Sequence, residues 1–595
     1  MKTKWNLNLI LDKETIASPE KYRKEVEKKT KAFIKKWLNN EAYLNDPKVL
    51  KEALDDYSYW ATNFGIYSDE SYYYGLSSSL DLNDPKIKAA SNIIHQKVVA
   101  LYNETQFFTL QLSKIEKDVQ KKMLASSGLS EYKHFLEQLF LSGKYTLSDK
   151  EERIMNMKSK VSKGNWVDML SGLLAKEEKE ILDKNGKKAV KNFSEVMELI
   201  SDPNKKVRDK ASLALNEIFE KHLDVAEHEL NSVLENKRIN DEIRGYKRAD
   251  ESRHISDDVE TKSVDILVET VTNRFDIAKR YYKLKARLLK QKKLEYHEKN
   301  VEVGKVVKEY KYKDAYDLVY KTFEKLDPKF SSIFKEFHDN GQVDVFSKKG
   351  KRSGAFCSYY TKKTPVYVFL NHSDNLNNVL TLAHEFGHAF HFVLSKENQD
   401  ELNNDFPMAT AETASTFFED FVLEEVLQDA TEEEQLSIMT KKLNDDISTI
   451  IRQVACYNFE KDIHNEFRSI GYVSKERFGE LFSKNMSAYM GSSVEKSDGS
   501  QNWWVYWSHI RQYFYVYSYA FGLLASKALQ KEVKKDPKNI EKMKTFLSAG
   551  SSKSPKDLFK DLGINVSSAK VWNDGLDEVE ELLNRTEKLA KKLGY

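Results

Sequence analysis

The chain has 595 residues, enough for several domains with sizeable cores, and it carries 95 Lys and Arg against 93 Asp and Glu, a formal net charge of +2. This balance gives no electrostatic reason to expect nucleic acid or an anionic membrane as a partner. The 22 Gly and 9 Pro are too few for a turn-rich β architecture, so the composition predicts a mainly α-helical protein.

The cysteine content and the apolar runs indicate a compartment. Cys357 and Cys456 are too few for a disulfide framework and are typical of a protein from a reducing compartment. The first residues lack the apolar run of about 7–15 residues that a secretory signal needs. No stretch approaches the roughly 20 apolar residues of a membrane span. We therefore expect a cytoplasmic protein.

The N-terminal third is predicted to be helical. Residues 22–37 contain neither Gly nor Pro and carry apolar residues at helical spacing. A helix break is predicted at residues 81–85, where Asp, Asn and Pro gather. Ser148 followed by Glu151 has the pattern of a capping box, which opens another helix. A long helix is expected after the turn signal at residues 201–204.

The region 343–370 departs from the helical pattern. Glycines and one proline separate two runs of β-forming residues, 355–360 and 366–369. We expect two or three short strands that form a small sheet in an otherwise helical protein. The helical period returns after residue 371 and continues nearly to the end of the chain.

The strongest chemical signal is the sequence His-Glu-Phe-Gly-His at residues 384–388. Two histidines four residues apart on a helix lie on one face about one turn apart, so both imidazoles can reach one metal ion. Glu385 then lies beside that ion as a candidate general base. Apolar residues on both sides of the motif predict a buried helix, and Ser373 or Asp374 is expected to cap its N-terminus.

A catalytic zinc ion normally takes three protein ligands and leaves one position open, so a third ligand is expected. His391 and Glu412 are the two candidates. A second helix is predicted to begin near Thr410, and Glu412 and Glu419 share one face of it. One of these glutamates could bind the metal while the other accepts a hydrogen bond from an imidazole. We favour Glu412, because three ligands on one helix would crowd one side of a tetrahedral ion.

Residues 503–519 form a dense aromatic segment. Its last eleven residues contain His509 and four tyrosines at alternate positions, Tyr513, Tyr515, Tyr517 and Tyr519. Dense aromatic residues are most often core residues, but neutral hydroxyls or an imidazole can also donate hydrogen bonds to the oxyanion of a tetrahedral intermediate. On a helix, Tyr519 would share a face with Tyr515, and Tyr517 would point elsewhere.

Taken together, the motif at 384–388 and the later glutamate pair resemble the thimet/neurolysin-type zinc oligopeptidases, specifically the oligoendopeptidase F branch. Further segments stand in that family's order and approximate spacing: Arg244-Gly245-Tyr246, residues 350–356, Arg452-Gln453, residues 514–517, and residues 548–551 near Pro555. The resemblance covers most of the chain from about residue 115 onward. The first hundred residues match only in helical character.

The resemblance implies a mainly α, zincin-type helical metallopeptidase with a small β-sheet beside a deep catalytic cleft. Such a protein binds one zinc ion (Zn2+) and cuts oligopeptides internally. By position in the motif, the ligands would be His384, His388 and Glu412, and Glu385 would be the base. Glu419 would hydrogen-bond a ligating histidine.

The resemblance also implies residues that contact the substrate. An edge strand beside the zinc helix would align the substrate backbone through Gly354 and Phe356. His509 and Tyr515 would contact the substrate or the oxyanion. The segment 509–512 lacks the His-Phe-Tyr run of close relatives, so the four tyrosines of the aromatic segment remain alternatives for the donor.

These expectations divide the chain into an N-terminal helical region, a helical oligopeptidase N-terminal domain and a zinc metallopeptidase catalytic domain: residues 1–115, 116–200 and 201–595. The expected partners are oligopeptide substrates, without nucleic acid or membrane. Two alternatives are a metallocarboxypeptidase of similar fold and a non-catalytic peptide-binding protein. Glu385 beside an intact ligand set disfavours the second, because a binding protein does not need a base beside the metal.

Overall fold

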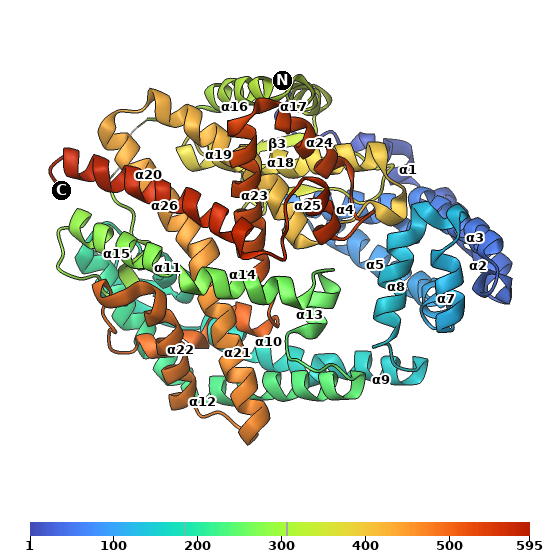
Figure 1. Cartoon of the computed structure of the whole chain (residues 1–595), viewed down its shortest axis with the longest axis horizontal. Coiled ribbons are helices and arrows are strands. Elements are labelled where there is room, and N and C mark those ends of the chain that lie inside the picture. The colour runs from blue at the N-terminus through green and yellow to red at the C-terminus, as the bar shows by residue number, and fades with distance from the viewer. Residues whose placement is uncertain (184, 305–307) are drawn as a thin grey trace. The chain divides into compact units, whose positions relative to one another are not determined.

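The computed structural model describes residues 1–183, 185–304 and 308–595 (Figure 1). The chain forms two compact units, each assembled from segments that are distant in sequence. Unit 1 contains residues 1–144, 308–428 and 529–564, and unit 2 contains residues 145–307, 429–528 and 565–595. The three linear domains expected from the sequence stay a prediction, because these units group residues by contact and not by sequence order.

Unit 1 is mainly helical and carries one small sheet, as the composition predicts. Its helices are α1 (Lys13–Ala17), α2 (Glu20–Trp37), α3 (Pro47–Asn63), α4 (Ser68–Leu80), α5 (Pro85–Thr105), α6 (Phe107–Ser113), α7 (Lys117–Leu124), α8 (Lys133–Gly143), α16 (Tyr312–Leu326), α17 (Pro328–Asn340), α18 (Leu376–Asn398), α19 (Met408–Asp429), α24 (Ile540–Ser548) and α25 (Pro555–Asp561). Its strands are β3 (Val343–Phe346), β4 (Phe356–Ser358) and β5 (Tyr367–His372).

The predicted N-terminal helix and its neighbours are confirmed. Helix α2 buries Val26, Phe33 and Trp37 along one stripe. The predicted break separates α4 from α5, where the Asp84 side chain accepts hydrogen bonds from the first backbone amides of α5. Pro85 occupies the first turn of α5, where a missing N–H costs nothing.

The small sheet of unit 1 has the strand order β3-β5-β4, with β5 parallel to β3 and antiparallel to β4. The predicted strands are therefore confirmed. The N-terminal segment covers this sheet, because the Trp5 indole donates a hydrogen bond to the Val368 carbonyl at 2.9 Å and its ring lies 5.3 Å from that of Phe369. Helix α18 also packs on β4 and β5.

Helix α24 lies beside α18 although about 150 residues separate them in sequence (Figure 1, the red helix next to the yellow one). The Gln399 side chain, just after α18, donates a hydrogen bond to the Ser548 carbonyl at the end of α24. This contact ties the C-terminal part of unit 1 to the helix that carries the histidine motif.

Unit 2 is also mainly helical. Its helices are α9 (Asp149–Ser159), α10 (Asn165–Ala175), α11 (Phe193–Leu199), α12 (Lys205–Arg244), α13 (Glu251–Ser256), α14 (Thr261–Asn273), α15 (Asp276–Leu288), α20 (Glu432–Asp446), α21 (Arg452–Ile470), α22 (Lys475–Met490) and α26 (Ala569–Lys592), and its strands are β1 (Glu178–Leu182) and β2 (Lys188–Asn192). Helix α23 (Tyr517–Lys535) belongs to unit 2 up to Ala528 and to unit 1 from Leu529 onward. The predicted capping box at Ser148 and Glu151 opens α9, and the predicted long helix is α12.

The hairpin formed by β1 and β2 was not predicted. The two strands pair antiparallel from Glu178 with Asn192 to Leu182 with Lys188. Only Ile181 among the strand residues is fully buried, and most of the others are Lys or Glu. Such a charged segment with little periodic hydrophobicity gives no strand signal, so its register depends on the hairpin turn and on contacts with α12.

Two further properties concern the cysteines and the hydropathy of the helices. Cys357 and Cys456 are free thiols. Among the described residues, we find no helix whose length and hydropathy together would let it cross a membrane.

Candidate active site

Helix α18 carries His384, Glu385 and His388, and its start differs from the prediction. The cap is Asn375, whose side chain accepts the Asn378 backbone N–H at 3.1 Å. Neither predicted cap is correct. Asp374 has a left-handed backbone (φ 58°), and Ser373 donates its N–H to the Asn378 side chain instead. The chain therefore turns at Asp374, and Asn375 is the residue with extended backbone next to the helix.

Gly387, inside the motif, lets α18 and α19 approach closely. A Cβ atom at this position would lie 2.6 Å from the Ser415 Cα and 2.7 Å from the Ala414 carbonyl oxygen. Both distances are far shorter than van der Waals contact, so only glycine fits here. Glu412 lies one turn before Ser415 on α19, and the close approach brings it to the histidines. This role of Gly387 was not predicted from the sequence.

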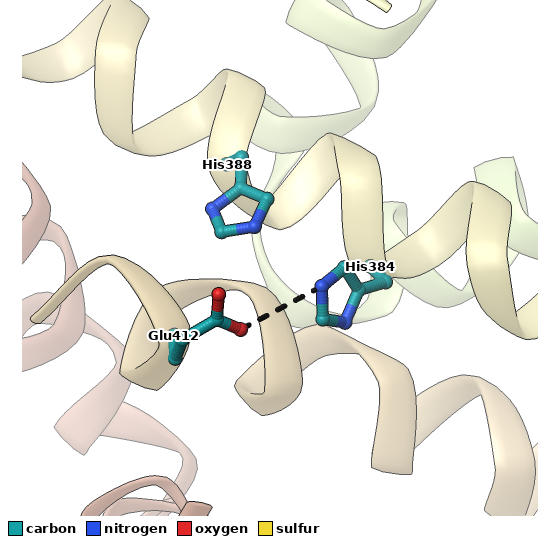
Figure 2. A group of neighbouring side chains, drawn as sticks. All are labelled: His384, His388 and Glu412. Atoms are coloured by element: carbon teal, nitrogen blue, oxygen red, sulfur yellow. Dashed lines mark ion pairs between the residues drawn. The ribbon is translucent and has the colours of Figure 1, made fainter. Parts of the chain in front are cut away.

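The three predicted metal ligands come together in unit 1 (Figure 2). His384, His388 and Glu412 are half-buried, and one donor atom from each lies within 4.8 Å of the others. The two imidazole centroids are 5.1 Å apart, and His384 Nε2 lies 3.8 Å from a Glu412 carboxylate oxygen. Two imidazoles and one carboxylate are a donor set that catalytic zinc takes, so these residues fit a zinc ion.

Glu419 orients the first of these histidines. One of its carboxylate oxygens lies 3.3 Å from His384 Nδ1, on the side of the ring away from Glu412. A carboxylate there keeps the proton on Nδ1 and leaves the Nε2 lone pair for a metal. This is the arrangement that the sequence analysis expected for the two glutamates of α19.

The electrostatics of the group favour a cation among its side chains. Burial opposes a charged imidazole at His384, but Glu419, with help from Glu385 and Glu412, raises the pKa of His384 to about 9. Burial, and then the neighbouring charge of His384, lowers the pKa of His388 well below its ordinary value. Carboxylates that hold a proton this strongly at His384 also attract a metal cation.

Glu385 points toward the small sheet and is 6% exposed. Burial raises the pKa of its carboxyl group to about 7, while the charge of His384 and a hydrogen bond from the Cys357 backbone act in the opposite direction. Cys357 is the central residue of β4, so the candidate base and the sheet are in direct contact.

His391 takes no part in the donor group. Its side chain is 1% exposed, and its ring stacks on Phe406 with centroids 3.9 Å apart. The Phe546 ring of α24 lies 5.8 Å from it. Burial lowers the pKa of His391 to about 3. The packing of this histidine is that of a core residue.

Strand β4 is an edge strand, because among the described strands only β5 pairs with it. The Phe356 side chain turns toward the N-terminal segment, with its ring 4.6 Å from Phe369 and 6.2 Å from Trp5. The Gly354 carbonyl accepts a hydrogen bond from the Asn371 side chain at 2.7 Å. The Phe356 ring and the Gly354 carbonyl therefore already have partners within unit 1.

The four tyrosines of the aromatic segment, in unit 2, differ in their partners. The Tyr513 hydroxyl donates to the Val233 carbonyl at 3.1 Å, and the buried Tyr517 hydroxyl donates to Asp257 at 2.8 Å. Each of these two hydroxyls therefore already holds a structural contact. Tyr515 and Tyr519 differ from them in their hydrogen-bond partners, which lie within the aromatic segment itself.

The Tyr515 hydroxyl forms a hydrogen bond with His509 Nδ1. The Tyr519 hydroxyl lies 3.5 Å from that of Tyr515, so these two hydroxyls and one imidazole form a polar group. Tyr515 precedes α23 and is not part of it, contrary to the helical interpretation of this segment. It is nevertheless a neighbour of Tyr519, as expected, because the turn before the helix places its ring 5.6 Å away.

His509 stands on a short 3₁₀ helix (Ser508–Arg511) that a buried ion pair fixes in place. The Arg511 guanidinium binds both carboxylate oxygens of Glu229, at 3.0 and 2.8 Å. It also donates to the Trp504 and Trp507 carbonyls, both at 2.9 Å. This role of Arg511 was not predicted, and its place as the one cation in an aromatic segment is the sequence signal that could have found it.

A second group of potential donors in unit 2 is better explained as an ion-pair network. Asp209, His297 and Glu298 have donor atoms within 4.8 Å of one another. However, Arg208 donates twice to one oxygen of Glu298, at 2.9 and 2.7 Å, and Lys205 lies 3.3 Å from the same oxygen. These cations already neutralise the carboxylate that a metal ion would need.

The sequence matches known protein families and individual relatives. The family profile described as Peptidase family M3 matches residues 198–578, and the profile described as Oligopeptidase F matches residues 111–171. The chain is 26% identical over 594 residues to oligopeptidase PepF of Bacillus subtilis, which covers 97% of this chain and 85% of that protein. It is also 26% identical over 526 residues to an oligoendopeptidase F homolog of Lactococcus lactis, with 86% of each chain covered.

Solved structures show the same fold. A crystal structure from Chlamydophila abortus matches with a TM-score of 0.85 at 20% identity and covers 99% of this chain and 98% of that one. Oligoendopeptidase-F from Enterococcus faecium matches with a TM-score of 0.72 at 18% identity, over 97% and 100% of the two chains. The matched M3 profile spans more than half of this chain and includes the histidine motif and both glutamates of α19. The chain therefore belongs to peptidase family M3.

Proposed function

We propose that this protein is a zinc-dependent endopeptidase that hydrolyses internal bonds of oligopeptides. One observation carries the proposal: His384, His388 and Glu412 converge from two helices with donor atoms within 4.8 Å, and Glu385 lies in the same motif. Membership of family M3 supports it, as do the names of the relatives, oligopeptidase PepF and oligoendopeptidase F.

In this proposal His384, His388 and Glu412 hold a single zinc ion. Glu419 keeps the proton of His384 on Nδ1, so that Nε2 presents its lone pair. A zinc ion bound by three protein ligands would supply Lewis acidity and one open coordination position.

Glu385 is proposed as the general base and then the general acid. Its carboxylate would take a proton from the attacking water and later pass it to the amine that leaves. The side chain is almost fully buried, and the Cys357 backbone hydrogen-bonds to it. These contacts limit its rotamers, so that it can hold and move one proton at a fixed place.

Strand β4 is proposed to align the substrate. An edge strand can pair with an extended peptide through its backbone N–H and C=O groups, as with an added strand. Gly354 and Phe356 would contribute through their backbone, since the Phe356 ring packs on Phe369. Backbone pairing of this kind depends little on side-chain identity, which suits an enzyme for varied oligopeptides.

Tyr515 is proposed as a hydrogen-bond donor to the carbonyl oxygen of the scissile bond, which gains negative charge as its carbon becomes tetrahedral. His509 is proposed to donate its Nδ1–H to the Tyr515 hydroxyl oxygen, so that the single hydroxyl proton stays available for the substrate. The support lies within unit 2. The hydroxyls of Tyr513 and Tyr517 already bind Val233 and Asp257, whereas Tyr515 is half-buried and bonded to His509.

We also propose a cytoplasmic location, which the free thiols of Cys357 and Cys456 support, because thiols persist in a reducing compartment. The near-balanced net charge of +2 is consistent with peptides as the partners.

The test is cleavage of a quenched fluorescent peptide blocked at both ends, combined with metal analysis. We expect about one zinc ion per chain, internal cleavage, loss of activity with a chelator and recovery with added zinc. A metallocarboxypeptidase would leave the blocked peptide intact, and a peptide-binding protein would bind it without cleavage. Either result would contradict the proposal.

A further inference from the structure

The residues just before Tyr515 have an unusual backbone. Tyr513 and Phe514 both adopt left-handed conformations, with φ of 53° and 62°. Nowhere else among the described residues do two consecutive non-glycine residues have positive φ. Bulky side chains avoid this region, so such a turn persists only where the surrounding structure enforces it.

Several neighbours hold the first residue of this turn, Tyr513. Its hydroxyl bonds to the Val233 carbonyl, and the Asn236 side chain donates to the same hydroxyl at 3.3 Å. The Lys163 ammonium lies 4.0 Å from the centre of its ring. These contacts fix the side chain but none of them reaches the backbone of the turn.

The backbone of the turn is held by Glu460 of α21. One of its carboxylate oxygens accepts the Phe514 N–H at 3.0 Å. The Phe514 ring packs beside this bond, 4.8 Å from His464 and 5.4 Å from Tyr457, both also on α21. The turn is thus attached to one helix by a hydrogen bond and by ring packing.

A buried glutamate at position 460 costs free energy of folding. Its side chain is 0% exposed, and burial raises the pKa of its carboxyl group to about 8. Its second oxygen has no hydrogen-bond partner among the described residues. Burying a carboxyl group costs free energy unless hydrogen bonds replace its lost hydration. The hydrogen bond from the Phe514 N–H is the compensating contact of this group.

We propose that Glu460 is a positioning residue: it holds the left-handed turn at Tyr513 and Phe514 and thereby keeps the Tyr515 hydroxyl against His509. The inference rests on the proposed role of Tyr515 as a donor. Tyr515 follows the turn directly, so the direction of its side chain depends on the Phe514 backbone. Arg511 anchors the short 3₁₀ helix that carries His509, and the hydrogen bond between His509 and the Tyr515 hydroxyl then has one geometry.

The test compares two variants of the full-length chain, Glu460→Leu and Glu460→Gln. Leucine removes the acceptor, whereas the glutamine side chain still offers a carbonyl oxygen to the Phe514 N–H. We expect Glu460→Leu to lower kcat roughly 10- to 100-fold, with KM and metal content little changed, because a misplaced donor loses transition-state stabilisation. Glu460→Gln should restore kcat to within about threefold. Equal losses in both variants would overturn the inference.

A double-mutant cycle shows whether Glu460 acts through Tyr515. In the Tyr515→Phe background, Glu460→Leu should cost less than about threefold more, because the group that it positions is already gone. If each substitution lowers kcat independently, so that the two fold-changes multiply in the double variant, the inference is overturned. If Tyr515→Phe alone leaves kcat unchanged while Glu412→Ala abolishes it, the proposed role of Tyr515 fails and the metal centre stands.

A readout without catalysis tests the turn itself. Amide hydrogen exchange of the peptide covering residues 513–516 should be roughly five- to tenfold faster in Glu460→Leu and unchanged in Glu460→Gln. Unchanged exchange in the leucine variant would contradict the inference whether or not the protein proves to be a peptidase.

Two further variants control for folding. Glu298→Leu removes another fully buried glutamate of unit 2 and leaves Arg208 without its partner, so it should destabilise the fold at least as much but keep kcat. If Glu460→Leu fails to fold, Glu460→Asp serves instead, because it keeps the carboxyl group and withdraws it from Phe514 by one methylene. A normal kcat and normal exchange in Glu460→Asp would overturn the inference.

Discussion

The proposed metal ligands of unit 1 and the proposed hydrogen-bonding residues of unit 2 are positioned by different kinds of backbone. His384, His388 and Glu412 stand on regular helices, and each is oriented by helical geometry and by the close approach of α18 to α19. His509 stands on a short 3₁₀ helix, and Tyr515 follows two left-handed residues. The first group therefore depends on the pairing of two elements, and the second depends on individual buried neighbours.

This difference has a consequence for substitutions. Metal binding should be lost when a donor is removed or when α18 and α19 are pushed apart. The geometry of the Tyr515 and His509 pair should be lost when a supporting residue is removed, even a residue that does not touch the substrate. The predictions below test this difference, beginning with the largest expected effect.

Removal of a metal donor should abolish function. Glu412→Ala opens the donor set, so we expect loss of both zinc and peptidase activity. His391→Ala is the matched control on α18, because His391 packs on Phe406 away from the donors and should leave zinc content near normal. Metal analysis gives the zinc content of each variant, and turnover of a blocked peptide gives its activity. If the His391 variant loses zinc and the Glu412 variant keeps it, the ligand assignment is wrong.

Removal of the base should leave the metal in place. Glu385→Gln keeps size and hydrogen bonding but cannot accept the proton, so turnover should fall by about 10²-fold or more while zinc content stays near one per chain. Steady-state kinetics and metal analysis on the same preparation check this. Near-normal turnover would show that Glu385 is not the general base.

Removal of one hydroxyl in unit 2 should act on kcat alone. Tyr515→Phe should lower kcat by about 10²–10³-fold with little change in KM or zinc content, the loss typical of one oxyanion donor. Tyr517→Phe is the control, because its hydroxyl binds buried Asp257, and its effect should fall on stability. A large loss of kcat at Tyr517 with none at Tyr515 would require the donor to be reassigned.

The smallest expected effect concerns the approach of the two helices. Gly387→Ala places a methyl group against Ser415, so we expect destabilisation by about 1–3 kcal/mol in urea unfolding, together with weaker zinc binding. Gly75→Ala in α4 is the control. No atom lies within 4 Å of its new Cβ, so it should stabilise the helix slightly. Equal behaviour of both variants would mean that the close approach is unimportant.

The contrast between the two groups also explains what the sequence could predict. The histidine motif and the shared face of Glu412 and Glu419 follow from a repeat of 3.6 residues, which sequence spacing displays directly. The helix start was predicted one or two residues early, because Ser373, Asp374 and Asn375 all favour a cap and only the backbone angles distinguish them.

Other features left no sequence signal. The backbone at Tyr513 and Phe514 leaves helical geometry, so spacing alone could not separate Tyr515 from its neighbouring tyrosines. The β1–β2 hairpin is rich in charged residues and has one buried strand residue, and it lacks the hydrophobic alternation that predicts a strand. Glu460 looked like one more charged residue on a helix, and only its burial against Phe514 distinguishes it.

The central claim is that the histidine motif and Glu412 hold the metal. The most direct measurement is anomalous X-ray scattering at the zinc edge from crystals of the zinc-loaded protein. The account predicts one strong peak about 2.0–2.2 Å from nitrogen atoms of His384 and His388 and from a carboxylate oxygen of Glu412. A peak at Asp209, His297 and Glu298 instead, or no peak at the histidine motif, would contradict it.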